Sequence, residues 1–407
     1  MAENKSMRVQ FAPSGVGLGH AGRCIPIARG LQNRNGNTEI FFSTYLDAVS
    51  YVRQEGFSTV EVPPMDFKVK PDGTVDFRRT AANPGPFVAS FNFLEQVGKE
   101  IEVMGTFKPD LVVSDSRASP IVAARMLGIP TICILNQFQV IIPRETHYLR
   151  LAKFADAITL AILGKIWTTG VKVMIPDFPP PYTISTDNLR IPKAYRKKIK
   201  LIGPILPVRP DALPTKKELR KKLGLQDEKP VIFVPISGPL KERAYLISIL
   251  QRIFTSFPDN YQIVMSLGYP KSNAAPVRYG NFTVFRWIPN RFEYMKACDI
   301  VISRAGHGTI LQTICYGKPA ILIPTPSHTE QHNNAKKAIK HGVALMIEQE
   351  NLHRETLLST MKEMMENKRF VQKAVEIQKE VSVVDGLETA IETTLEVVEG
   401  GKACISA

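Results

Sequence analysis

A histidine stands in a glycine-rich turn near the start of the sequence. The segment Gly17-Leu-Gly-His-Ala-Gly22 follows the short apolar run Arg8–Ala12 and precedes a helical pattern. A neutral imidazole can take a proton from a hydroxyl, and it does so best when a carboxylate holds its other nitrogen. Asp115 follows another apolar run and is the candidate partner of His20. The alternative interpretation is that His20 caps the turn and Asp115 caps a helix near Ser119.

Gly17 and Gly19 would let an acceptor molecule approach the backbone of this turn. The same segment matches the G-x-G-x-x-G pattern of dinucleotide-binding folds. That fold also needs an acidic residue at the end of its second strand to hold a ribose. Ser43-Thr44 occupies that position, which argues against NAD or FAD.

A second candidate site is the segment Ile300-Val-Ile-Ser-Arg-Ala-Gly-His-Gly-Thr309, which passes from a strand through a loop into a helix. Its small residues leave backbone N–H groups free at the helix N-terminus, where the helix dipole favours an anion. The Thr309 hydroxyl can add a donor, and His307 could bind the same phosphate. The segment lacks the Gly-Lys-Ser/Thr ending of a P-loop ATPase.

Polar side chains gather again between Ile323 and Asn334, after a further strand. Glu330 and Gln331 could bind the hydroxyls of a sugar-like ligand. A nearby histidine pair, His328 and His332, has a spacing that suits a metal on one helical face, but His328 is expected to precede the helix, so we expect no metal site. Upstream, Trp287 could flank a planar base, or it could be an ordinary core residue.

Alternating strands and helices must position these residues. Continuous apolar runs separated by helical patterns indicate parallel sheets that helices cover on both faces. Proline-rich segments at Asp177–Pro181 and Leu201–Pro207 separate two such α/β halves, which we place at residues 1–203 and 204–407. The expected strands are Arg8–Ala12, Glu39–Ser43, Leu111–Ser114, Thr131–Leu135, Val231–Val234, Gln262–Ser266, Phe282–Phe285, Ile300–Ser303, Ala320–Ile323 and Ala344–Ile347.

The composition is that of a globular protein with a strong basic excess. The 407 residues are 44% hydrophobic and 22% charged, with a formal net charge of +14. Arg190–Arg243 alone holds 15 Lys and Arg against 5 Asp and Glu. This stretch is either a solvated helix and linker or a contact for an anionic surface. Apart from Phe233 in an expected strand, it holds only Tyr195 as an aromatic residue, and it matches no nucleic-acid-binding motif, so we expect no nucleic acid partner.

Cysteine usage and the absence of an apolar leader indicate a cytoplasmic protein. Five cysteines lack CxxC spacing, and residues 1–7 show no signal-peptide pattern. We expect no membrane-spanning segment. The semi-apolar segment Phe154–Met174 is interpreted either as a buried helix or as one lying in a membrane interface.

Together these segments resemble the GT-B nucleotide-sugar glycosyltransferases, most closely the branch of lipid-linked N-acetylglucosaminyltransferases and UDP-glycosyltransferases. The resemblance covers nearly the whole chain. It is specific in the second half, where four motifs occur in family order, and moderate in the first. The motifs are Trp287-Ile-Pro, Arg304-Ala-Gly-His-Gly-Thr309, Gly317-Lys-Pro319 and Glu330-Gln331, with Gly17-Leu-Gly-His20 in the first half.

The resemblance implies two Rossmann-like domains facing across a cleft, with a last helix at about 386–399 packing back on the first domain. It implies that His20 is the base, that Asp115 is its partner and that Glu330 and Gln331 bind the donor sugar. The implied nucleotide-binding residues are Ser237, Gly238, Trp287, Ile288, Arg304, Ala305, Gly306, His307, Gly308, Thr309 and Gln312.

The family commonly has Glu where this sequence has Gln312, to bind the ribose hydroxyls, so UDP is expected but another nucleotide stays open. We expect an inverting transfer, without metal or other cofactor, to a hydroxyl acceptor, of which a lipid-linked one is a candidate. A peripheral contact with an anionic membrane face is a further expectation. A nucleotide-sugar epimerase and a non-catalytic nucleotide-sugar-binding subunit stay as alternatives, and the sequence leaves the oligomeric state open.

Overall fold

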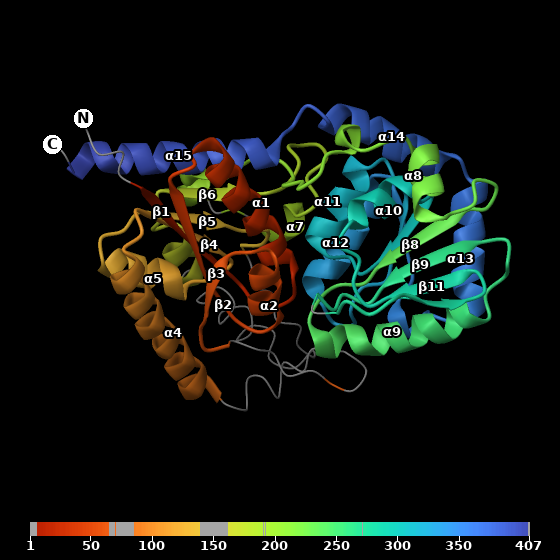
Figure 1. The fold of residues 1–407 in the computed structure, drawn as a ribbon, viewed down its shortest axis with the longest axis horizontal. Coiled ribbons are helices and arrows are strands. Elements are labelled where there is room, and N and C mark those ends of the chain that lie inside the picture. Colours follow the sequence, from red (N-terminus) through yellow and green to blue (C-terminus); the bar gives the residue numbers. More distant parts are fainter. Residues whose placement is uncertain are drawn as a thin grey trace.

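The computed structural model describes residues 6–64, 70, 85–138, 162–189, 191, 193–270 and 272–405. These residues form two α/β domains that lie side by side, each with a central sheet between helices (Figure 1). The predicted class, two parallel-sheet α/β domains, is confirmed; the described strands pair in parallel except β10 with β11.

The first sheet brings the ends of β1 and β4 together. Its described strands run in the order β3-β2-β1-β4-β5-β6-β7, and Pro13 at the end of β1 lies in register with Asp115 at the end of β4. Their bounds are β1 Met7–Pro13, β2 Thr38–Thr44, β3 Ser58–Glu61, β4 Leu111–Asp115, β5 Thr131–Ile134, β6 Lys172–Ile175 and β7 Ile199–Leu201.

Helices cover both faces of this sheet, because alternate residues of β1 and β4 point to opposite sides. Three helices, α1 Gly19–Arg34, α2 Asp47–Gln54 and α15 Gly386–Ile405, bury their apolar sides on one face. Two others, α4 Gly85–Phe107 and α5 Ser119–Met126, pack on the other.

The second sheet repeats the plan, with described strands in the order β10-β11-β9-β8-β12-β13-β14. Helices α10, α11, α12 and α14 pack on one face, and α9 and α13 on the other. The bounds are β8 Val231–Pro235, α9 Leu240–Thr255, β9 Gln262–Ser266, β10 Val277–Tyr279, β11 Phe282–Phe285, α10 Arg291–Ala297, β12 Ile300–Ser303, α11 His307–Cys315, β13 Ala320–Leu322, α12 Thr329–Lys340, β14 Ala344–Met346, α13 Arg354–Glu366 and α14 Arg369–Val381.

The chain crosses between the domains twice. It first leaves the sheet of the first domain after β7, and it returns in α15, which lies along the first domain (Figure 1). Ile391 of α15 belongs to the core of the first domain. Gly30 of α1 permits this close approach, because a Cβ there would lie 2.1 Å from Ile391 Cδ1.

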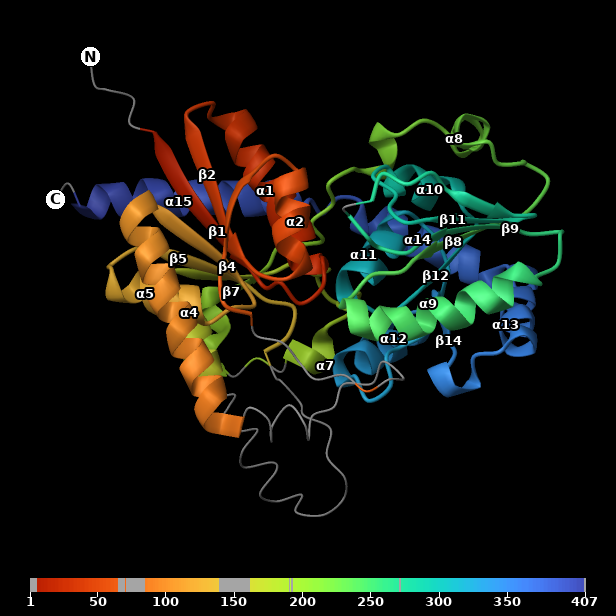
Figure 2. The same ribbon diagram turned by 60° about the horizontal axis from the view of Figure 1, so that its bottom comes forward.

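A short helix, α7 Thr186–Leu189, lies against α12 between the two domains (Figure 2). Asn188 of α7 donates a hydrogen bond to Asn334 and accepts one from Asn333, at 2.9 and 2.8 Å. These side-chain contacts fix the first domain against the helix that carries Glu330.

The segment Phe154–Met174 is not one helix. Residues 154–161 lie outside the described residues, residues 162–167 are helical, and Lys172–Ile175 forms β6 between β5 and β7. The helical interpretation is therefore wrong at the end of the segment, where backbone pairing in the sheet overrides a short apolar run that fits either structure. No helix in the described part of the chain is both long and apolar enough to span a bilayer.

Acidic neighbours already pair with much of the predicted basic stretch. In α8, Lys216–Leu223, a capping box formed by Thr215 and Glu218 starts the helix. Its Arg220 lies 2.6 Å from Asp299, and its Lys222 lies 2.7 Å from Glu293. Other basic side chains of this stretch are exposed and form no ion pair with a described acidic residue. They lie in and just after the 3₁₀ helix η1, Lys193–Lys198, and are Lys193, Arg196, Lys197, Lys198 and Lys200.

Candidate active site

The loop after β1 and the end of β4 position the predicted base pair. The backbone N–H of Ser14 donates to the Asp115 carbonyl at 3.0 Å, which ties the loop to the end of β4. Gly17 has a φ of +73°, a left-handed conformation that glycine adopts freely, and it turns the chain into α1. His20 therefore lies in the first turn of α1, directly above Asp115.

His20 and Asp115 form a hydrogen-bonded pair. His20 Nδ1 lies 2.7 Å from Asp115 Oδ1, with the carboxylate fully buried and the imidazole 21% exposed. Burial opposes ionisation of Asp115, but the neighbouring Arg23 and His20 outweigh it and hold its pKa at about 2. Since an ionised carboxylate only accepts hydrogen bonds, Nδ1 must carry the proton. Nε2 then keeps a free lone pair, the form that a general base requires.

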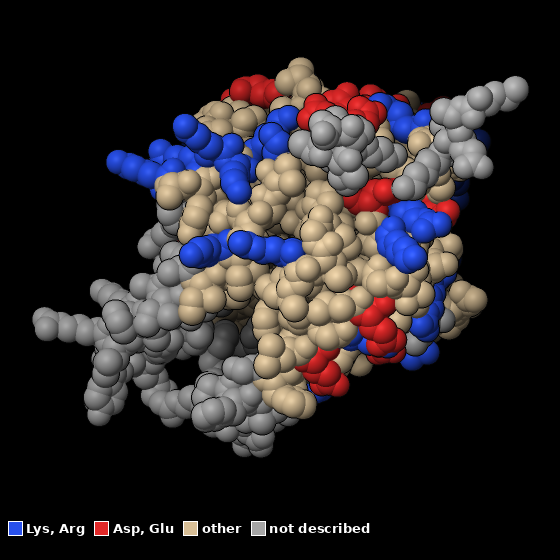
Figure 3. Space-filling view, turned by 90° about the vertical axis from the view of Figure 1, so that its left-hand side faces the viewer, with Lys and Arg blue, Asp and Glu red and all other residues tan. Residues whose placement is uncertain are grey.

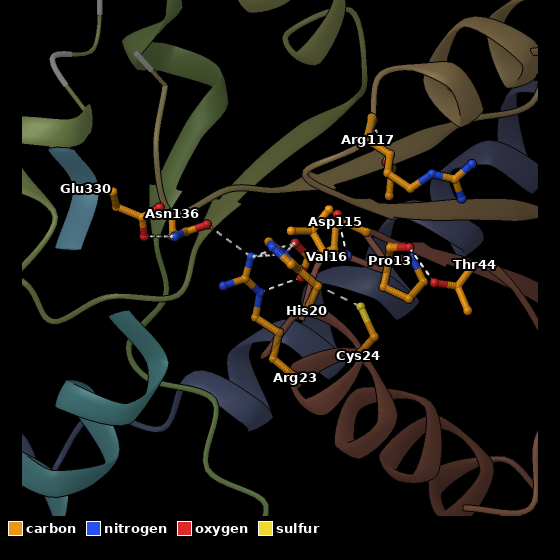
Figure 4. A network of polar contacts seen from close by, with 12 residues as sticks. Pro13, Val16, His20, Arg23, Cys24, Thr44, Asp115, Arg117, Asn136 and Glu330 are labelled. Carbon is orange, nitrogen blue, oxygen red and sulfur yellow. Dashed lines mark hydrogen bonds and ion pairs between the residues drawn. The ribbon is translucent and has the colours of Figure 1, made fainter. Parts of the chain in front are cut away.

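A polar network missed by the sequence analysis surrounds this pair (Figure 4). Arg23, one turn after His20 on α1, contacts both oxygens of Asp115. Its Nη2 also donates to Asn136 Oδ1 at 3.3 Å, and Asn136 Nδ2 donates to Glu330 Oε1 at 2.7 Å. An unbroken chain of polar contacts thus joins His20 in the first domain to Glu330 on α12 of the second. The i, i+3 spacing of Arg23 from His20 was the available signal.

The two domains enclose a cavity of about 710 Å³. The loop after β1, which holds Gly17, meets the loop after β8, which holds Gly238, across this cavity. A Cβ at Gly17 would lie 3.4 Å from Gly238 Cα. Among the predicted residues, the cavity wall includes Gly17, Gly19, His20, Ser237, Gly238, Trp287, Ile288, Gly306, His307, Gly308, Thr309, Gln312, Glu330 and Gln331. Asp115 lies behind His20, and the cavity wall does not include Arg304 or Ala305.

The N-terminus of α11 faces the cavity. Its N-cap, Gly306, makes no side-chain capping hydrogen bond, and Gly308 and Thr309 of the first turn line the wall. The first backbone N–H groups of a helix have no partners within the helix, and they carry the positive end of its dipole. This arrangement can bind the phosphates of a ligand through the backbone.

The His307 side chain pairs with the protein itself. Its Nε2 lies 3.0 Å from Asp177 Oδ2, and the imidazole is 2% exposed. Asp177 also accepts hydrogen bonds from the backbone N–H groups of Ile184 and Ser185, at 3.1 and 2.8 Å. The sequence suggested a phosphate contact for this imidazole; in the structure the side chain links the start of α11 to the segment that joins the domains.

Arg304 was predicted to contact the nucleotide, and its guanidinium binds backbone carbonyls instead. It donates to Ile323 and Pro324, each at 3.2 Å, and to Glu242 at 3.1 Å. Burial lowers the pKa of Arg304 to about 10. Because these carbonyls belong to the loop after β13 and to the first turn of α9, Arg304 ties these two parts of the second domain together. Ala305, fully buried, packs in the core beside it.

The polar residues at the N-terminus of α12 form hydrogen bonds that start the helix. His328 is the N-cap, and its side chain accepts from the Gln331 backbone N–H, so it precedes the helix as expected. The Gln331 side chain accepts from the Thr325 backbone N–H at 2.8 Å through Oε1. Its amide nitrogen and the second carboxylate oxygen of Glu330 can still face a ligand, since Glu330 Oε1 already accepts from Asn136.

Trp287 is half-buried on the cavity wall. Its ring meets Tyr51 of α2 edge-on, with centroids 5.6 Å apart. The residue therefore both borders the cavity and packs against the first domain. The core interpretation holds for the part of the ring that packs on the first domain, and contact with a planar base stays a prediction for the part on the cavity wall.

Comparisons with known proteins agree with this geometry. Residues 240–389 match the glycosyltransferase family 28 C-terminal domain. A protein of Methanosarcina acetivorans, called an uncharacterized glycosyltransferase, is 26% identical over 98% of this chain and 100% of its own length. The UDP-N-acetylglucosamine–N-acetylmuramyl-(pentapeptide) pyrophosphoryl-undecaprenol N-acetylglucosamine transferase of Desulforamulus reducens is 27% identical over 89% of this chain and 91% of its own length.

The chain is a glycosyltransferase of GT-B type. Its fold matches solved structures of such enzymes. The spinosyn rhamnosyltransferase SpnG superposes with a TM-score of 0.67 at 15% identity, covering 96% of this chain and 100% of that one. The calicheamicin glycosyltransferase CalG4 gives 0.63 at 16% identity, covering 97% and 99%. These findings favour the glycosyltransferase over the epimerase and the non-catalytic subunit, and they imply a nucleotide-sugar donor and an acceptor.

Proposed function

We propose that this glycosyltransferase moves a sugar from a UDP-sugar to an acceptor hydroxyl, with inversion at the anomeric carbon. One observation carries the proposal: His20, which Asp115 holds from behind, and the uncapped N-terminus of α11 line the same cavity from opposite domains. A base and an anion site that share a cavity are what a direct displacement requires.

The chemistry follows from this placement. Nε2 of His20 accepts the proton of the acceptor hydroxyl as its oxygen attacks the anomeric carbon. The bond from that carbon to the diphosphate breaks, and the N–H groups of α11 stabilise the departing charge. Preorganised donors of this kind each contribute about 3 kcal/mol in favourable cases. A single displacement from the face opposite the leaving group inverts the anomeric centre.

Glu330 and Gln331 are the proposed contacts for the donor sugar, and Trp287 with Ile288 would border the base. Gln312 lines the cavity and would bind the ribose hydroxyls without a charge. The name of the Desulforamulus reducens relative supports a UDP donor. We propose no metal or other cofactor, because the helix N-terminus supplies the stabilisation of the leaving group.

A panel of nucleotide diphosphate sugars tests the donor by thermal shift and then by product formation. We expect a UDP-sugar to stabilise the protein most, by about 2.7 kcal/mol at 100 times its dissociation constant. Product formation should persist in excess EDTA, and the product should show the inverted anomeric configuration by NMR. His20→Ala should abolish transfer while donor binding continues. Transfer at the wild-type rate in this variant would exclude His20 as the base.

The acceptor side of the cavity favours a molecule with an apolar part. Phe93 of α4, Leu163 and Trp167 line it beyond His20. Figure 3 shows a broad uncharged area on one side of the first domain, with Lys and Arg as well as Asp and Glu side chains near it, and the basic residues of η1 are exposed. We therefore propose a lipid-linked acceptor at an anionic membrane face, where each Lys or Arg can add about 1 kcal/mol.

Flotation with anionic and neutral liposomes tests this membrane contact. We expect binding to anionic vesicles that weakens with salt and with a variant in which Lys193, Arg196 and Lys197 are changed to Gln. A matched variant in which Lys216, Lys217 and Lys221 on α8 are changed to Gln should bind the anionic vesicles as the wild type does. No flotation at moderate salt would favour a water-soluble acceptor.

A further inference from the structure

Arg23 makes contacts that no role described so far requires. Its Nη2 lies 2.5 Å from Asp115 Oδ1 and 3.1 Å from His20 Nδ1, and its Nε bonds to the other carboxylate oxygen. The guanidinium is 12% exposed and is held from a third side by Asn136. A permanent positive charge is thereby fixed next to the imidazole of His20.

The contact between Arg23 and His20 is not a hydrogen bond. Nδ1 already donates its proton to Asp115, so it has no lone pair to offer, and the guanidinium has only donors. The contact is therefore a close approach of a cation to the ring. It becomes a repulsion between like charges whenever His20 takes up a second proton.

Asp115 and Arg23 act on His20 in opposite senses. The carboxylate alone would favour the imidazolium strongly, because both groups are shielded from water. Arg23 partly neutralises that carboxylate by bonding to both of its oxygens, and its own positive charge repels an imidazolium. In the described residues, these two are the charged side chains in contact with the imidazole. The other titratable side chains on the cavity wall are Tyr45, Arg117, Glu242, Arg291, His307, His328 and Glu330.

We propose that Arg23 is a positioning residue that keeps His20 neutral, and so able to act as a base, at a lower pH than the His20–Asp115 pair alone would allow. The proposal rests on the proposed role of His20 as the base. Arg23 acts through His20 and Asp115 and need not touch the substrate. Asp115 fixes one proton on Nδ1 of His20, and Arg23 opposes the uptake of a second proton on Nε2. The carboxylate alone would favour both.

Chemical modification of His20 tests the proposal without catalysis. Diethyl pyrocarbonate acylates neutral imidazole, and mass spectrometry of the His20 peptide follows its rate across a pH series. In Arg23→Met, we expect the midpoint of His20 reactivity to rise by about one pH unit or more, or about a tenfold slower reaction well below the midpoint. Arg23→Lys should restore much of the wild-type midpoint. An unchanged midpoint in Arg23→Met would overturn the proposal.

Arg29→Met is the matched control, since the exposed Arg29 lies on the same helix but pairs with Glu55. It should leave the midpoint unaltered. Circular dichroism checks that each variant is folded. If Arg23→Met does not fold, Arg23→Gln removes the charge while keeping one hydrogen bond to Asp115, and the same shift is expected.

The dependence of turnover on pH separates this proposal from the proposed function. If both hold, the acidic limb of the profile for Arg23→Met moves to higher pH by the same amount as the modification midpoint. A shift in modification without a shift in turnover would show that His20 is not the base, while the role of Arg23 toward His20 stands. Equal loss of turnover at every pH with an unchanged midpoint would make Arg23 a purely structural or substrate-binding residue.

Discussion

Replacing Asp115 with Asn separates the charge of the buried carboxylate from its shape. The side chain is fully buried, and its described side-chain partners are His20, Arg23 and the Cys24 thiol, at 3.8 Å. An amide NH₂ can donate to Nδ1 and so favour the imidazole tautomer whose Nε2 carries the proton. We therefore expect turnover to fall by about 10²- to 10⁴-fold, the range attributed to general base catalysis.

The same change leaves the Arg23 guanidinium without its counter-charge. Breaking a buried ion pair on one side costs about 3–5 kcal/mol, so the free energy of unfolding should fall by about that amount. Turnover is measured with saturating donor and acceptor, and unfolding is measured in urea at neutral pH. Only folded protein is counted in the turnover, so the two losses are read separately.

Asp110→Asn is the matched control, at the other end of β4. Its carboxylate accepts from the Arg8 backbone N–H at 2.8 Å, far from the cavity wall. We expect this change to lower the free energy of unfolding by at most about 1.5 kcal/mol and to leave turnover nearly unchanged. If folded Asp115→Asn kept a rate close to that of Asp110→Asn, the reasoning about the His20–Asp115 pair would be refuted.

Three further predictions concern the donor, acid stability and the return helix. Glu330→Gln should lower kcat/KM for the donor by about 10- to 100-fold, because a charge-assisted hydrogen bond to a sugar hydroxyl is lost; donor saturation curves measure this, and an unchanged value would remove Glu330 from the sugar site. The pKa of Asp115 is held at about 2, below its usual 3.8, so it stabilises the fold above about pH 4 and loses that contribution as pH falls to about 2. The difference in unfolding free energy between wild type and Asp115→Asn should therefore shrink by about 2 kcal/mol over that range, and a constant difference in urea unfolding would contradict it. Gly30→Val should destabilise the protein by about 1–3 kcal/mol by forcing Ile391 away, whereas Gly36→Val, which faces open space, should shift the melting temperature far less.

Strands buried on both faces could be predicted closely from the sequence. Ile300–Ser303 and Gln262–Ser266 have the bounds that were expected, since continuous apolar runs between turn residues leave little choice. The start of α12 at Thr329 carries a weaker signal, because its first turn is polar and lines the cavity, so burial does not mark it. β6 was missed because a four-residue apolar run does not distinguish strand from helix.

The sequence predicted the position of the loops that form the candidate site. It did not predict the hydrogen-bond partners of the buried side chains behind those loops. The glycine turns and the start of α11 lie where the motifs indicated, on one cavity. The partners of Arg304 and His307 depend on which buried groups lie behind the loops, and a motif does not contain that information. Asn136 carries no motif, and its position follows only from β5 lying next to β4.

The return of α15 to the first domain has a consequence for how the protein is made. Synthesis proceeds from the N-terminus, so the side of α1 around Gly30 meets α15 only after the whole second domain has been produced. The described cores of the second domain contain no residue of α15, so the domain that is synthesised second can complete its core first, which reverses the usual order for successive domains. Until residues 386–405 have been synthesised, the nascent first domain exposes the side of α1 that α15 later covers.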